Sequence, residues 1–175
     1  MGVICNMKKL INNLIEKAKR AGICSEWLSK IQLAASKDDL LKVYLTGVIW
    51  CSKNNLFSSE FVHQNFSPEL LQKHGIYIDD NVLSNNARKI VLLGNCKAAI
   101  DVTNFGVSEI YITGNSEAEI EVSGHAFCMI RILENAKVKL QMKDVSTTVV
   151  LWYSGKLLEI EKDDTAKYRY IAKKE

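Results

Sequence analysis

Two different spacings of apolar residues divide the chain. Up to about residue 75 the apolar residues recur at steps of three and four, which is the period of a helix with one buried face. From about residue 90 they recur at steps of two, which is the period of a strand. The sequence therefore predicts an α+β protein, with an N-terminal α-helical segment over residues 1–75 and a strand-rich segment over residues 76–175.

The helical segment is predicted to contain several short helices. An apolar stripe predicts a helix over residues 7–21, ended by Gly22. Ser25 is expected to cap a second helix, and Ser36 a third that runs to about residue 53. Two shorter helices are expected to follow, the second with Pro68 in its first turn, where the missing N–H costs nothing.

The strand-rich segment repeats every 20 residues. GNCKAAIDV, which starts at Gly94, matches GNSEAEIEV, which starts at Gly114, in residue class at nearly every place. When the chain is written in rows of 20, apolar columns result, such as Ile90, Ile110, Ile130 and Val150, and Ala98, Ala118, Val138 and Leu158. A fixed period without insertions is typical of a stacked repeat. We therefore predict a short single-stranded parallel β-solenoid (β-helix) of about four 20-residue coils, with like positions stacked about 4.8 Å apart.

The positions between the apolar columns differ from one strand of the coil to the other. On one strand they are charged and alternate in sign: Lys97, Glu117 and Lys137 form one column, and Glu119, Lys139 and Glu159 form the next. Stacked neighbours of opposite sign stabilise a sheet by roughly 0.2–1 kcal/mol per pair. We therefore interpret this face as solvent-exposed and structural, and not as a catalytic cluster of carboxylates.

On the other strand the alternate positions are mostly apolar as well. The residues at these positions are Val91, Leu93, Tyr111, Arg131, Leu133, Leu151 and Tyr153. A strand that is apolar on both sides needs cover on its outer side. Either the N-terminal helices or another protein chain, which includes a second copy, is expected to supply the cover, and these residues are the candidate interface.

A solenoid also has two open ends, each with a row of unpaired backbone groups. The helical segment is expected to cap the first end. At the second end Trp152 is expected to close the core, and Tyr168 and Tyr170 are expected to add a partial fifth coil. The tail KDDTAKYRYIAKKE is charged, which predicts that it discourages end-to-end stacking.

Composition and charge exclude several classes of protein. The net charge of +3 is too small for a strong nucleic-acid binder, so nucleic acid is not an expected partner. No apolar run approaches the roughly 20 residues that cross a bilayer, so a membrane partner is not expected either. The five cysteines include no CxxC pair and no Cys/His cluster, which predicts reduced thiols in a cytoplasmic protein without a metal or cofactor.

Catalytic motifs are missing from the sequence. There is no phosphate-binding loop, no nucleophile elbow and no HExxH, and the histidines are scattered. One weak alternative site combines Asp79, Asp80 and His125, as in solenoid enzymes that act on sugars with carboxylates or a histidine. A turn role is the competing interpretation for all three residues, because they lie in predicted corners.

The stretch from Trp27 to about Trp152 resembles uncharacterised small helix-plus-β-solenoid proteins encoded in Bacteroidales genomes and prophages. The segments that carry the resemblance are AASKDDLLKVYLTGVIWCSKNN, HGIYIDDN, VSEIYITGNSEAEI and HAFCMIRILENAKV. No functional residue follows from the resemblance, but it implies a bacterial host cytoplasm or a virion as the location. We therefore expect a non-enzymatic protein-binding or scaffolding module of phage or prophage origin. A carbohydrate-active enzyme and a host-defence inhibitor are the alternatives.

Overall fold

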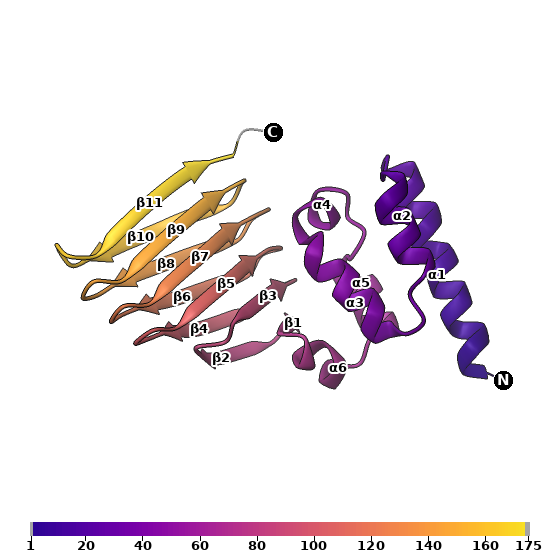
Figure 1. Ribbon diagram of the computed structural model, residues 1–175, viewed down its shortest axis with the longest axis horizontal. Helices are drawn as coiled ribbons and strands as arrows, with labels where there is room; N and C mark the ends of the chain where they lie inside the picture. The colour runs from indigo at the N-terminus through magenta and orange to yellow at the C-terminus, as the bar shows by residue number, and fades with distance from the viewer. Residues whose placement is uncertain (1, 174–175) are drawn as a thin grey trace. The chain divides into compact units, whose positions relative to one another are not determined.

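The protein is described by a computed structural model that covers residues 2–173, with side chains from Met7 onward. The chain forms two compact units, Met1–His74 and Gly75–Glu175. The first unit is helical, and the second is a stack of parallel strands (Figure 1). The predicted architecture is confirmed: N-terminal helices precede a parallel β-solenoid whose coils have the predicted length.

The described part of the first unit contains six helices: α1 (Gly2–Arg20), α2 (Ser25–Gln32), α3 (Lys37–Thr46), α4 (Val48–Lys53), α5 (Ser59–Asn65) and α6 (Pro68–Lys73). Serine caps start three of them. The side chains of Ser36, Ser58 and Ser67 each accept a hydrogen bond from the backbone N–H three residues later. Each cap satisfies a donor that the first turn of a helix cannot pair internally.

Two predicted helix boundaries are wrong. α2 begins at Ser25 itself, after Cys24, which is extended and gives no side-chain cap. The predicted third helix is divided at Gly47, whose φ of −124° is not helical, into α3 and α4. Glycine is a poor helix former, so the helix is interrupted here at little cost.

The solenoid consists of two parallel sheets that alternate along the chain. Sheet A contains β1 (Ile76–Ile78), β3 (Lys89–Leu93), β5 (Val107–Ile112), β7 (Phe127–Ile132), β9 (Thr147–Trp152) and β11 (Lys167–Ala172). Sheet B contains β2 (Asn81–Asn85), β4 (Lys97–Val102), β6 (Glu117–Val122), β8 (Lys137–Met142) and β10 (Lys156–Lys162). Each coil therefore contributes one strand to each sheet.

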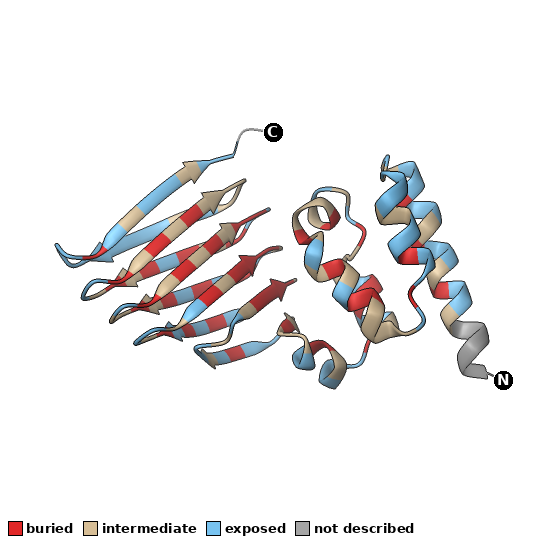
Figure 2. Cartoon of the chain, viewed as in Figure 1, coloured by how far each residue is buried: buried red, intermediate tan, exposed pale blue. Residues whose placement is uncertain are grey.

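Equivalent positions of the sequence repeat pair with each other over most of the stack. Ile110 pairs with Ile130 in sheet A, and Ala118 pairs with Val138 in sheet B. The inward columns form one hydrophobic core, in which Ile110 and Ile130 are fully buried. Buried positions alternate with more exposed ones along most strands (Figure 2). The strand spacing of two thus produces the thin apolar core that the sequence predicts.

The solenoid has about five coils, one more than the fixed period of the sequence reveals. The additional coil is formed by β1 and β2, in which Ile76 pairs with Val91 and Asn81 with Lys97. These partners lie closer together in the sequence than those of the later coils, which is why the fixed period does not reveal the first coil. The expected partial coil at the other end is present as β11, which contains Tyr168 and pairs with β9.

The register slips by one residue within β10. Leu157 pairs with Val138, whereas Glu159 pairs with Lys139, and Leu158 lies in the irregularity between them. The prediction that Leu158 continues an inward column is therefore wrong, and its side chain is 52% exposed. A bulge of this kind inserts one residue and turns the bulged side chain away from its column.

The corners of the coils have a repeated backbone conformation. Gly94, Gly114 and Glu134 occupy equivalent places and have φ angles of 71°, 66° and 55°. The next residue in three successive coils is asparagine, and the Nδ2 of Asn115 donates to the Oδ1 of Asn95 at 3.2 Å. The Nδ2 of Asn135 donates to Asn115 in the same way. The corners thus form an asparagine ladder along the stack.

Candidate docking faces of the solenoid

The seven candidate interface residues lie at outward positions on sheet A or directly after its strands. None of them belongs to the core between the two sheets. Val91, Leu93, Tyr111 and Leu133 are buried, whereas Arg131, Leu151 and Tyr153 are partly exposed. The part of this face that remains accessible therefore lies on β7 and β9, toward the C-terminal coil.

A charged network lies within this apolar face. The carboxylate of Glu109 accepts hydrogen bonds from Arg131 and from the hydroxyl of Tyr111, the latter at 2.9 Å. The Nζ of Lys89 lies 2.9 Å from the other oxygen of Glu109. The guanidinium of Arg131 also lies over the ring of Tyr111, 4.7 Å from its centroid.

The pKa values in this network follow from burial and charge. Burial acts to raise the pKa of Glu109, but the hydrogen bonds and the two cations around it prevail and hold the pKa below its ordinary value. Burial raises the pKa of Tyr111 to about 12. The carboxylate therefore stays charged and serves to neutralise Arg131, whose Nε is buried without an acceptor in the described structure.

The outward face of sheet B is charged, and its charges pair from coil to coil. Lys137 contacts Glu117 at 2.6 Å, and Lys139 contacts Glu119 at 3.3 Å. The hydrogen bond from Lys137 lowers the pKa of Glu117. The predicted alternation of charge is thus confirmed, and these carboxylates act as structural partners of lysines.

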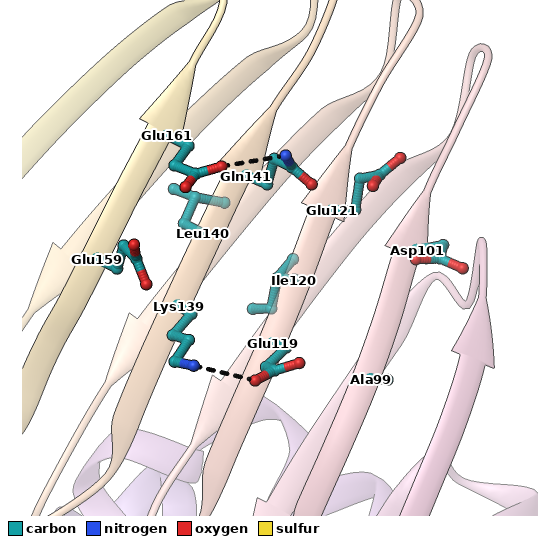
Figure 3. Close-up of a pocket in the computed structure, with 10 residues that line it drawn as sticks. All are labelled: Ala99, Asp101, Glu119, Ile120, Glu121, Lys139, Leu140, Gln141, Glu159 and Glu161. Carbon is teal, nitrogen blue, oxygen red and sulfur yellow. Dashed lines mark hydrogen bonds and ion pairs between the residues drawn. The ribbon is translucent and has the colours of Figure 1, made fainter.

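A hollow on this face crosses four strands of sheet B. Its lining residues are Ala99, Asp101, Glu119, Ile120, Glu121, Lys139, Leu140, Gln141, Glu159 and Glu161. Figure 3 shows Lys139 directed toward Glu119 and Gln141 toward Glu161 across neighbouring strands. The hollow is acidic, but its side chains follow the ladder of the sheet and do not converge on one point.

The structure does not bring Asp79, Asp80 and His125 together. The two aspartates lie at the corner between β1 and β2, and His125 lies at the opposite edge, between β6 and β7. The strand between these edges separates the residues by about 20 Å, far more than the roughly 5–10 Å between the paired carboxylates of glycosidases. Asp79 instead accepts hydrogen bonds from the backbone and side chain of Asn95 and so begins the asparagine ladder. The ring of His125 stacks on Phe105, with 5.2 Å between the centroids.

The described residues offer few other chemical sites. No group of three or more His, Cys, Asp or Glu side chains among them could hold a metal ion. Cys24, Cys51, Cys96 and Cys128 are free thiols, and burial raises the pKa of Cys128 to about 12. No described helix is long and apolar enough to cross a membrane.

The last coil presents two exposed edge strands. β10 ends sheet B, and β11 ends sheet A. Ile160 and Tyr170 lie in inward columns but are 39% and 45% exposed, because no further coil covers them in the described chain. The outward side chains of β10 include Glu159 and Glu161, whereas those of β11 are basic or apolar. The core is therefore open at this end, between an acidic and a basic edge.

Two of these features were missed by the sequence reasoning. The apolar columns of this strand do not indicate the Glu109 network, although Lys89 and Glu109 are one repeat apart in the sequence and form a column of their own. The charge difference between the two terminal strands was missed because the tail was treated as one charged segment. Separating the outward residues of the tail by strand would have revealed it.

Comparison with known proteins adds no functional assignment. No protein-family model, no curated protein and no solved structure matches the chain. The class that the geometry defines is a helical unit followed by a five-coil parallel β-solenoid. The resemblance to prophage-encoded solenoid proteins stays a prediction.

Proposed function

We propose that the protein is a non-enzymatic protein-binding or scaffolding module that uses the outward face of sheet A. The observation that carries the proposal is the difference between the two outward faces of one solenoid. On sheet B the outward side chains are charged and pair with each other, as Lys137 and Glu117 do. On sheet A they are mostly apolar and lie outside the core between the sheets.

The accessible part of the sheet A face has the chemistry of a protein contact. Leu151 and Tyr153 supply apolar and aromatic surface, and Arg131 lies beside them with a buried Nε that lacks an acceptor among the described residues. Aromatic and arginine side chains are enriched at the centres of protein interfaces. A partner that offers an apolar surface would therefore suit this face. An inhibitor that binds a host-defence protein would be a module of the same kind.

A carbohydrate-active role has no comparable support. Its acid and base must reach one substrate, and the residues expected to act there lie at opposite edges of the solenoid. Three of the glutamates on sheet B, Glu117, Glu119 and Glu121, are engaged with lysines. A virion or bacterial cytoplasmic location remains part of the proposal and depends on the resemblance alone.

Affinity capture with the full chain tests the proposed face. Leu151→Lys places a charge in the apolar column, whereas Lys139→Ala is a matched control on the outward face of sheet B. A partner should be retained by the natural chain and by the control, and lost with Leu151→Lys, while circular dichroism shows all three folded. Retention of the same proteins by all three chains would exclude this face.

A further inference from the structure

The two edge strands of the terminal coil differ in charge. The outward positions on β11 and directly after it hold Lys167, Arg169, Ile171 and Lys173. All of these side chains are basic except the apolar Ile171. The outward residues in the second half of β10 are Glu159 and Glu161, and Leu158 is exposed beside them. Within residues 2–173 neither Arg169 nor Glu159 forms an ion pair. One edge of the open coil is thus basic, and the other is acidic over the second half of its strand, after the outward Lys156 at its start.

We propose that two copies of the chain associate end to end through their terminal coils, around a two-fold axis parallel to the strands. This proposal rests on the proposed function and names a second copy as one partner of the module. In this arrangement β11 of one protomer pairs antiparallel with β10 of its partner, and the reciprocal pair forms on the other sheet. The contact is therefore isologous and closed, as in most homodimers.

The shape of the end selects this axis. β11 lies half a coil further along the stack than β10, because the chain climbs one strand spacing, about 4.8 Å, per coil. A two-fold axis parallel to the strands places the further-extending strand β11 of each protomer against the shorter-reaching strand β10 of its partner. The gap between the two protomers is therefore the same on both sheets. A two-fold axis perpendicular to the sheets would instead pair β11 with the β11 strand of the partner. The two β10 strands would then lie about 4.8 Å too far apart to pair with each other.

The charges select the same arrangement. A rotation about an axis parallel to the strands leaves the position of each residue along the strand unchanged. Lys162 and Lys167 lie at the same corner, so the end of β10 and the start of β11 are level with each other along this axis. Lys167 therefore comes beside Glu161 of the partner subunit, and Arg169 beside Glu159 of the partner subunit. Ile171 comes beside the exposed Leu158 of the partner subunit, and Ile160 and Tyr170 are covered. Pairing of like edges would instead bring the basic strands together, which is unfavourable.

The size of the end predicts a weak, salt-sensitive dimer. Strands of about 20 Å and a sheet separation of about 10 Å define an end much smaller than the roughly 800 Å² per partner of a standard interface. Backbone pairing and four interchain ion pairs must therefore supply most of the stability. Exposed ion pairs are screened by salt, so the dissociation constant is expected to rise with ionic strength.

Charge reversal tests the proposal in the full-length protein. Analytical ultracentrifugation over a concentration series, at low and high salt, gives the dimer dissociation constant of the natural chain. Arg169→Glu and Glu159→Arg should each weaken the dimer by about tenfold or more, because the two-fold axis places each change at two contacts. The double variant should restore dimerisation. Lys97→Glu makes a charge reversal on β4, away from the terminal strand of sheet B, and should leave the dimer unchanged.

Restoration in the double variant is the decisive result. Arg169 and Glu159 lie on different sheets of one chain and point outward from opposite faces, so only a contact between copies can reunite them. A chain that stays monomeric at millimolar concentration, a dimer insensitive to the single reversals, or a double variant as weak as either single one would overturn the proposal. Leu151→Lys should lose partner capture yet retain the dimer, so failure of the proposed docking face is distinguishable from failure of end-to-end pairing.

Discussion

Replacing Gly114 with alanine is expected to destabilise the solenoid by about 2–5 kcal/mol. Gly114 has a φ of 66° and lies directly above the equivalent corner residue of the previous coil, Gly94. A Cβ at this position would lie 2.4 Å from the oxygen of Gly94 and 2.9 Å from its nitrogen. These contacts are with backbone atoms of a stacked coil, so no flexible side chain can move aside.

The expected magnitude has two contributions. The left-handed backbone costs an alanine about 1–2 kcal/mol relative to glycine. Moving two stacked corners apart to remove the overlap costs about a further 1–3 kcal/mol, as in other overpacked sites. Glu134 occupies the same place one coil later with a φ of 55°, but its carboxylate accepts a hydrogen bond from the N–H of Gly114 at 2.8 Å. Alanine cannot make this compensating bond.

Gly22→Ala is the matched control for the backbone contribution. Gly22 has a φ of 76°, and a Cβ there would have no neighbour within 4 Å. Its substitution should therefore cost about 1–2 kcal/mol at most. Denaturant unfolding by circular dichroism gives the global change, and hydrogen exchange measured by mass spectrometry assigns it to the helical unit or the solenoid. If Gly114→Ala costs no more than Gly22→Ala, close stacking of the corners does not constrain this fold.

Three further results are expected. Ile130→Ala should reduce the free energy of unfolding by about 2–5 kcal/mol because it leaves a cavity in the buried core, whereas Val107→Ala, at a side chain 61% exposed, should change it by less than about 0.5 kcal/mol in the same denaturation assay. Glu109 has a lowered pKa, so its contribution to stability is present above the ordinary carboxyl pKa of 4.5 and is lost as the pH falls through the lower pKa of the folded state. Glu109→Gln should therefore flatten the acid limb of a plot of unfolding free energy against pH. An unchanged acid limb would contradict the role of the network. Cys24 is exposed and should react rapidly with a thiol reagent at mildly alkaline pH, whereas Cys128, buried with a pKa of about 12, should react only as the protein unfolds, and equal rates would refute the described burial.

The fixed period of the sequence determined the solenoid without any tertiary information. Each coil contacts only its two neighbours, so a residue such as Ile110 has its partner, Ile130, at a fixed distance along the chain. The same rule determined the charge pairs on sheet B, because Glu117 and Lys137 stack in the same way. The sequence period is sufficient to predict a contact wherever residues one repeat apart stack on each other in space.

Only the tertiary structure decided what lies outside this rule. The first coil is shorter than the later ones, so Asp79 had no column, and its distance from His125 depended on which edge of the stack each corner occupies. The bulge at Leu158 also breaks the period, because Leu157 pairs with Val138, 19 residues before it, whereas Glu159 pairs with Lys139, 20 residues before it. The pairing of charges around Glu109 depends on side chains that meet across strands.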